Sequence, residues 1–498
     1  MREESRVSGW IALLFAVTAG IWCFTIPIGE APDEREHLQY AEFIRDHGRL
    51  PTADDLQREA IPEAFQAPLY HAILSGLSAA TNFNPSRIIW FKNPIFDRTS
   101  FPGRANEFDH AAMRAVNASS DVLKFNIMRL PNVLFGALMI WILLQTMRTL
   151  GAFGSGGPLV IVAASTPLLT FTAGTIGNDM LAALFSALCV FALVRKEGRW
   201  IWIAAVSLAL GLLVKMTVLF LWFTLVAVMF WSRPRWRLTR ERLILMLVPL
   251  LSAAWTLNRT LYFHEREQGS SPSLTSYIIT AMKTLYHCAS TAVGVVGVHS
   301  IWLPGFVYGL FFGIDAVVLY RWFRNDRSGD LAKEISFAGW LATILLFLVA
   351  VYWYRESGFS MHSRLFLPFV PASLVGPAMA WSETSTFTTN YRKYSGSLIV
   401  GFVLLIASFL PTTLWLGTAD TARTALSLVK PAEHYAAILS LLLSAVGAFL
   451  IMLIVARKCL PLLIAYAERK PTSMIWMAAA GFGANLLILF FHVRFFFL

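Results

Sequence analysis

The sequence has little charge, few cysteines and no nucleotide-binding loop. Charged residues make up 14% of its 498 residues, whereas soluble domains carry about 25%, which argues against a soluble protein. The four cysteines form no Cys-x-x-Cys pair and show no metal-ligand spacing, so neither a disulfide framework nor a zinc site is indicated. The pattern G-x-x-x-x-G-K-[ST] is absent, which argues against ATP-driven transport within this chain.

Apolar residues dominate instead. The chain is 56% hydrophobic and its mean hydropathy is +0.59, which predicts an all-α polytopic membrane protein with a single integral membrane domain over residues 1–498. The first apolar run, residues 9–29, lacks a small-residue cleavage site, so we expect a retained helix rather than a secretory signal. About thirteen spans are expected. They begin near Gly9, Asn126, Pro158, Asn178, Arg199, Met216, Arg242, Ile301, Ser336, Arg364, Ser397, His434 and Thr472.

Basic residues gather in alternate loops between these expected spans. They lie at residues 2–6, 195–199, 233–242, 321–327 and 457–470. The positive-inside rule makes these loops cytoplasmic, together with the N-terminus. The net charge of +11 is then a feature of topology, and no nucleic-acid partner is expected. The opposite, outer side holds a first loop, residues 30–125, with amphipathic helices, and a second long loop, residues 264–300.

Several ionisable residues follow the first span on what reads as a helix. Pro32 suits a first helical position, and acidic residues in a first turn interact favourably with the helix dipole. At helical spacing Asp33 and His37 share one face, while Glu34 lies on a neighbouring face. Two interpretations remain open: an interfacial helix with a well-formed start, or a catalytic cluster just outside the membrane.

Short motifs recur in order along most of the chain. They are Pro-Asp-Glu-x-x-His (32–37), Gln-Ala-Pro-Leu-Tyr (66–70), Arg-Leu-Pro (129–131), GTIGNDM (174–180), GLLVKMT (211–217) and SRLFLPFVP (363–371). In these motifs the chain resembles the GT-C superfamily of membrane glycosyltransferases, especially a bacterial branch similar to protein mannosyltransferases and aminoarabinose transferases. The resemblance implies a GT-C-like fold in a bacterial inner membrane. It also implies a polyprenyl-phosphate-linked sugar donor and an active site on the outer face.

The resemblance also implies roles for acidic residues. Asp33 stands where such enzymes have a catalytic base in the first outer loop, with Glu34 as the alternate, and Asp179 stands where a second acidic residue is typical. His37 is expected to orient the base or to contact the sugar. Some relatives have a histidine-led pattern where this chain has Gln66–Tyr70, so a sugar or acceptor contact by that loop is not carried over.

Cations at the outer ends of spans are candidates for binding the donor phosphate. They are Lys215, Arg364, Arg259 and Arg355. Lys215 lies between two apolar runs, where a charge is costly enough to suggest a function. The alternative for these cations is that their side chains reach toward lipid headgroups. The alternative for Asn178 or Asp179 is that the residue caps a helix.

The expected function is sugar transfer to a hydroxyl of a glycan, lipid or protein acceptor. No cofactor is certain, although Asp33, Glu34 and Asp179 could together hold a divalent cation. The other readings are a carrier of lipid-linked sugars or anions, a polysaccharide ligase or polymerase, and a non-enzymatic scaffold. A carrier should show broken helices or ionisable residues near mid-membrane in symmetric halves, and the sequence shows no internal repeat.

Overall fold

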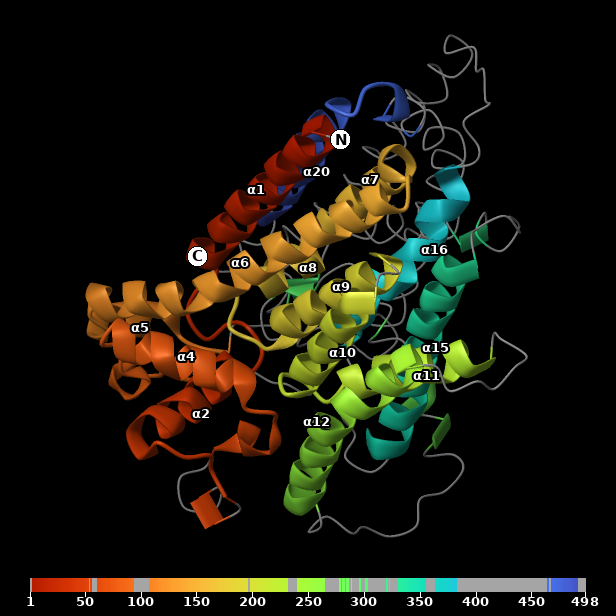
Figure 1. The fold of residues 1–498 in the computed structure, drawn as a ribbon. Coiled ribbons are helices and arrows are strands. Elements are labelled where there is room, and N and C mark those ends of the chain that lie inside the picture. The colour runs from red at the N-terminus through yellow and green to blue at the C-terminus, as the bar shows by residue number, and fades with distance from the viewer. Residues whose placement is uncertain are drawn as a thin grey trace.

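The computed structural model is almost entirely helical (Figure 1). It describes residues 2–52, 54–55, 61–93, 107–195, 198–231, 240–264, 330–354, 363–382 and 467–490, with short pieces between 277 and 322 and residue 464. Within this part of the chain the strands are β1 (Val295–Val296) and β2 (Ile301–Trp302), an antiparallel pair. The predicted all-α class is confirmed, although residues 301–302, where we expected a span to begin, are extended.

Apolar helices form the membrane part. Among the described residues, three helices are long and apolar enough to cross a membrane: α1 (Arg2–Thr25), α6 (Ser119–Thr149) and α15 (Asp330–Tyr354). The other helices of this part are α9 (Asp179–Arg195), α10 (Gly198–Leu212), α11 (Val218–Trp231), α12 (Arg240–His264), α16 (Val370–Ser382) and α20 (Ser473–Ile488). The expected spans from Ser397 and His434 lie outside the described residues.

One expected span is a broken pair of helices. Helix α7 (Phe153–Ala164) and helix α8 (Pro167–Ala173) meet at a bend of 67°. Pro167 has no N–H and disfavours the helical conformation at Thr166, which is extended. Asn485 on α20 donates a hydrogen bond of 2.9 Å to the carbonyl of Ser165, so a backbone group freed by the break is satisfied within the protein.

The membrane helices pack closely around the start of the chain. Helix α1 packs against α6, α8 and α20, so the first described helix lies beside the last (Figure 1). A Cβ atom on Gly174, just after α8, would lie 3.0 Å from the backbone of α1 at Ala19 and Cys23. The absence of a side chain there lets the loop before α9 approach the C-terminal end of α1.

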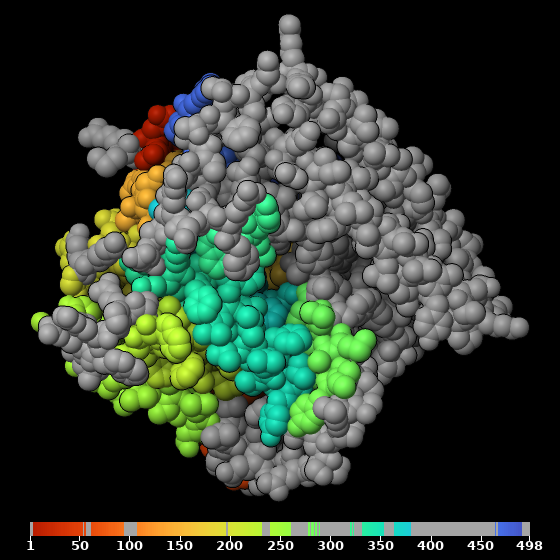
Figure 2. Space-filling view, turned by 90° about the vertical axis from the view of Figure 1, so that its right-hand side faces the viewer, coloured from red at the N-terminus to blue at the C-terminus, as the bar shows by residue number. Residues whose placement is uncertain are grey.

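Apolar side chains on α15 remain at the surface. Figure 2 shows α15 and α16 as the turquoise surface of one face. Phe337, Ile344 and Leu348 on α15 are all more than half exposed. Large apolar side chains gain nothing from contact with water, so this surface suits the hydrocarbon of a bilayer. The chain is a membrane protein.

Shorter helices form a separate layer at one end of α1 and α6 (Figure 1, lower left). They are α2 (Glu34–His47), η1 (Pro62–Phe65), α4 (Leu69–Ala80), η2 (Pro85–Arg87) and α5 (His110–Val116). Leu38, Tyr40 and Phe43 on α2 are buried, and this helix packs against α4 and η1. Helices therefore occupy the described part of the expected first loop, and we call this part the outer layer, after the side on which the sequence predicts it.

Candidate active site

The turn between α1 and α2 places Asp33 in an unusual conformation. We expected Pro32 to open the helix, but α2 begins at Glu34. Asp33 precedes it with φ of 63°, in the left-handed region. Residues other than glycine seldom adopt this region, and such positions persist where the surrounding contacts enforce them. The contacts of Asp33 and Glu34 therefore decide what this turn does.

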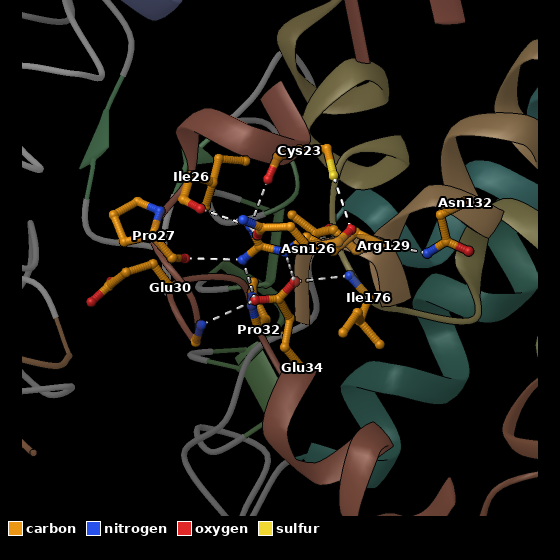
Figure 3. Close-up of polar contacts among 12 residues, drawn as sticks. Cys23, Ile26, Pro27, Glu30, Pro32, Glu34, Asn126, Arg129, Asn132 and Ile176 are labelled. Carbon is orange, nitrogen blue, oxygen red and sulfur yellow. Dashed lines mark hydrogen bonds and ion pairs between the residues drawn. The ribbon is translucent and has the colours of Figure 1, made fainter. Parts of the chain in front are cut away.

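Glu34 anchors the turn inside the protein (Figure 3). Its carboxylate accepts hydrogen bonds from Arg129 Nε at 2.8 Å and Nη2 at 2.7 Å. The backbone N–H groups of Gly29 and Ile176 donate to the same carboxylate at 3.2 and 2.9 Å. Glu34 is fully buried, and these donors fill most of its capacity to accept hydrogen bonds. Its surroundings favour a positioning role over the alternate-base role.

Arg129 on α6 completes this anchor. It is also fully buried and donates to the carbonyls at the end of α1, those of Cys23, Ile26 and Pro27, at 2.7–2.9 Å. A buried guanidinium paired with a carboxylate is tolerated only when its remaining donors are satisfied. The Glu34–Arg129 pair thus ties together the end of α1, the start of α2, helix α6 and the loop before α9.

Two carboxylate–cation pairs form the centre of the site. Asp33 Oδ2 pairs with Arg364 Nη2 on η3 (Ser363–Phe369), and Asp179 Oδ1 pairs with Lys215 Nζ. The structure therefore unites four of the residues singled out in the sequence. The Asp33 side chain is 39% exposed, whereas that of Asp179 is 3% and that of Glu34 is 0% exposed. Of these three acids, Asp33 is the one that an incoming molecule can reach.

His37 lies beside both pairs and contacts a second histidine. Its Nδ1 is 2.9 Å from Nε2 of His71 on α4, and Tyr40 stacks on His71 with ring centroids 4.1 Å apart. Burial lowers the pKa of His37 to about 4. The negative charge of Asp33 acts to raise this pKa, and the positive charges of Lys215 and Arg364 act to lower it. Burial also lowers the pKa of His71 well below its usual value. Both rings are neutral at pH 7, and one donates a hydrogen bond to the other.

The Gln-Ala-Pro-Leu-Tyr segment supports the loop that carries Asp179. Gln66 Oε1 accepts a hydrogen bond from Asn178 Nδ2, and the Tyr70 hydroxyl accepts one from the N–H of Gly177 at 2.9 Å. The Asn178 side chain also donates to the carbonyl of Val214 at 3.2 Å, next to Lys215. Asn178 thus bridges the two connections that supply the Asp179–Lys215 pair.

The remaining predicted cations are placed differently. Arg259 on α12 donates to the Tyr40 hydroxyl and the carbonyl of Pro51, each at 3.1 Å, and to the carbonyl of Ala64 at 2.5 Å. It braces the outer layer against α12, beside the histidine pair rather than in either ion pair. Arg355 lies outside the described residues.

Glu63 on η1 is a site residue that the sequence analysis missed. Its Oε2 atom is shielded from solvent and has no hydrogen-bond partner among the described residues. Burial and the negative charge of Asp33 raise the pKa of Glu63 to about 8, and the positive charges of Arg364 and Lys215 act against this. A lone acid in the apolar stretch Ile61–Phe65 was the available signal, but no motif drew attention to it.

The acidic residues do not form a metal site in the described part of the chain. No group of three or more histidine, cysteine, aspartate or glutamate side chains there could hold an ion. Glu34 faces Arg129, Asp33 faces Arg364 and Asp179 faces Lys215. Because each acid is paired with a different cation, these three residues do not fit the divalent-cation site that the sequence left open.

Comparison with known proteins supports the resemblance. The family model of dolichyl-phosphate-mannose-protein mannosyltransferases matches residues 120–257, which include Arg129, Asp179 and Lys215. The structure is similar to that of ArnT from Cupriavidus metallidurans bound to undecaprenyl phosphate, with a TM-score of 0.51 and 14% identity over 96% of this chain and 76% of that chain. The same protein in the apo state gives a TM-score of 0.48, 14% identity, and 96% and 77% coverage. No curated protein matches the chain.

These findings confirm two predictions. The chain has a GT-C-like fold, and its resemblance to membrane glycosyltransferases of the GT-C superfamily is supported by the family match as well as by the fold.

Proposed function

We propose that the protein is a membrane glycosyltransferase that moves a sugar from a polyprenyl-phosphate donor to an acceptor hydroxyl. The observation that carries this proposal is the exposed Asp33 carboxylate beside Arg364, next to the Asp179–Lys215 pair. The mannosyltransferase family match and the undecaprenyl phosphate bound to the structurally similar ArnT support a lipid-phosphate donor. A glycan, a lipid or a protein could supply the hydroxyl.

The chemistry needs a base on one side of the sugar and cations on the other. Asp33 accepts the proton of the acceptor hydroxyl while the hydroxyl oxygen attacks the anomeric carbon. The bond between this carbon and the phosphate oxygen breaks, and its electron pair remains on the departing lipid phosphate. Arg364 and Lys215 stabilise the charge that develops there. A direct displacement of this kind inverts the configuration of the anomeric carbon.

Arg364 connects donor binding with the base. Its Nε atom is buried and has no hydrogen-bond partner among the described residues, while its Nη2 atom pairs with Asp33. A guanidinium presents several donors that match a phosphate group. Donor phosphate therefore competes with Asp33 for Arg364. A carboxylate released from that pair can accept a hydrogen bond from the acceptor hydroxyl.

A carrier has weaker support, despite the broken α7–α8 span. Broken helices in carriers direct their ends and charged side chains at an ion or substrate. Here the break is closed by neutral groups, since Asn485 donates to the Ser165 carbonyl and also contacts Thr170 and Trp22. The charged side chains gather instead where the outer layer meets the bundle.

We place the N-terminus in the cytoplasm and the site on the outer face of a bacterial inner membrane. The alternation of basic loops supports this orientation. In the same orientation the outer layer and the two ion pairs face away from the cytoplasm. On that outer side lipid-linked sugars would meet their acceptors.

Release of the lipid carrier tests the proposed activity. Purified protein should be incubated with acceptor-containing membrane extract and a panel of undecaprenyl-phosphate-linked hexoses and pentoses. We expect wild-type protein to release undecaprenyl phosphate from at least one of them. The variant Asp54→Asn, which changes an exposed acid of the outer layer, should match wild type. Protein that binds undecaprenyl phosphate but releases it from no member of the panel would contradict the proposal.

A further inference from the structure

The turn that carries Glu63 is held rigidly against its neighbours. Helix η1 packs on α2 and on α12. The N–H of Gln66 donates to the carbonyl of Glu63 at 2.9 Å, and Arg259 on α12 holds the carbonyl of the next residue, Ala64. The backbone at Glu63 is therefore held from both sides, which limits where its side chain can lie.

The carboxyl group of Glu63 lacks a hydrogen-bond partner at one of its oxygens among the described residues. The Oε2 atom is shielded from solvent without a hydrogen-bond partner among the described residues. Buried polar atoms are rarely left in this condition, because the loss of hydrogen bonds to water costs free energy. A ligand that supplies the missing partner is a common reason for such an atom in a site. With a pKa raised to about 8 by burial, the group is protonated at pH 7 and can both donate and accept a hydrogen bond.

Glu63 lies among the charged groups of the site. Asp33 and Glu36, near the start of α2, act electrostatically on its carboxyl group, and so do Arg364 and Lys215. Asp33 and Arg364 also pair directly with each other. In the proposed reaction the sugar is bonded to the phosphate that Arg364 and Lys215 bind, and the hydroxyl that Asp33 deprotonates attacks its anomeric carbon, so a carboxyl group beside these three residues is close to the sugar.

We infer that Glu63 hydrogen-bonds a hydroxyl of the transferred sugar and helps to determine which sugar the protein accepts. This inference rests on the proposed function and adds a recognition residue to it. Asp33 provides the base and the cations bind phosphate, whereas Glu63 contacts the sugar, which is the part of the donor that differs between substrates. A polar group placed to satisfy a substrate hydroxyl discriminates strongly against donors that lack it.

Two substitutions separate recognition from a structural role. Glu63→Gln keeps a side chain that donates and accepts hydrogen bonds, whereas Glu63→Leu removes both abilities at similar size. Asp54→Leu makes the matched change at an exposed acid of the same layer. Affinity should be measured for sugar-free undecaprenyl phosphate and for the sugar-linked form that wild-type protein turns over fastest. Monodeoxy versions of that sugar should be measured as well.

We expect Glu63→Leu to bind the sugar-linked form about tenfold more weakly or worse, with unchanged affinity for undecaprenyl phosphate. Glu63→Gln should retain most of the affinity, and Asp54→Leu should behave as wild type. One monodeoxy donor should bind wild-type protein weakly and show little further loss with Glu63→Leu, because the contact is already missing.

The possible failures are distinguishable. Equal affinity of wild type and Glu63→Leu for the sugar-linked form overturns the inference and leaves the proposed function intact. Loss of affinity for sugar-free undecaprenyl phosphate in Glu63→Leu, with no recovery in Glu63→Gln, also overturns it, because the residue would then act through structure or through the phosphate. Wild-type protein that binds neither form contradicts the proposed function, and the inference with it.

Discussion

At the scale of single residues, neighbouring acids in one turn have different surroundings. Asp33 and Glu34 are adjacent, yet the first is partly exposed beside Arg364 and the second is buried against Arg129. The left-handed conformation of Asp33 produces this divergence, since a regular helix would have directed the two side chains only about 100° apart. Burial, rather than residue type, separates the acid that we propose as the base from the acid that holds the turn.

The sequence singled out the residues of the two ion pairs better than their buried neighbours. Helical spacing brought Asp33 and His37 together, and the cost of charge in apolar runs drew attention to Lys215. Arg129 was noted only as part of a motif, and His71 was not considered. Both are defined by partners distant in sequence, since Arg129 reaches Glu34 and His71 reaches His37. Spacing within one helix cannot reveal such pairs.

The histidine pair makes stability depend on pH. Burial lowers the pKa of His37 to about 4 in the folded protein, whereas an unfolded histidine titrates near 6.5. Between these values the unfolded state binds more protons, so stability is fully present above about pH 6.5 and is lost as pH falls toward 4. The nearby charges of Asp33, Asp179, Lys215 and Arg364 also act on the pKa of His37, and the value of about 4 already contains their effects.

We therefore expect the free energy of unfolding in detergent to fall by up to about 1.4 kcal/mol per pH unit below pH 6.5 for this one residue. Thermal unfolding between pH 7.5 and 4.5 measures the effect. His37→Gln should flatten the slope, and His47→Gln, at an exposed histidine of the same helix, should leave it unchanged. Equal slopes in wild type and His37→Gln would contradict the assignment of a buried neutral histidine.

At the scale of helices, periodicity and hydropathy predicted most of what is observed. Expected starts near Asn178, Arg199 and Met216 lie within two residues of α9, α10 and α11. Hydropathy did not predict the break between α7 and α8. The break follows from Pro167, which interrupts the helix inside a run that stays apolar. Hydropathy also failed at the start of α6, which begins at Ser119, where a polar helix in the outer layer continues into the apolar span.

At the scale of the whole molecule, orientation is the prediction on which the site's location depends. Cysteines introduced at Asp54 and Lys470, both exposed, should respond differently to a membrane-impermeant reagent added to intact cells. The positive-inside pattern predicts labelling at Asp54→Cys only, above the background of the native cysteines. Permeabilised cells should show labelling at both positions. The reverse result in intact cells would place the site on the cytoplasmic face and remove the proposed meeting of donor and acceptor outside.

The architecture assigns separate elements to separate tasks. The fold shared with ArnT supplies a helical bundle, and the outer layer closes one end of it with α2, η1 and α4. The Glu34–Arg129 anchor connects the two parts and holds Asp33 at their junction. The groups that we propose as base and phosphate-binding cations therefore come from segments far apart in the chain, and packing of the layer on the bundle brings them together.

Turnover by Asp33→Asn is the most direct test of this account. The amide keeps the size of the side chain but cannot take a proton from the acceptor, and general base catalysis contributes roughly 10²- to 10⁴-fold. Rate per folded molecule should therefore fall by about that factor, while affinity for undecaprenyl phosphate changes far less. Glu34→Gln should instead lower the amount of folded protein, because it weakens a buried ion pair. Asp33→Asn protein that folds, binds undecaprenyl phosphate and releases it at the wild-type rate would contradict the assignment of Asp33 as the base.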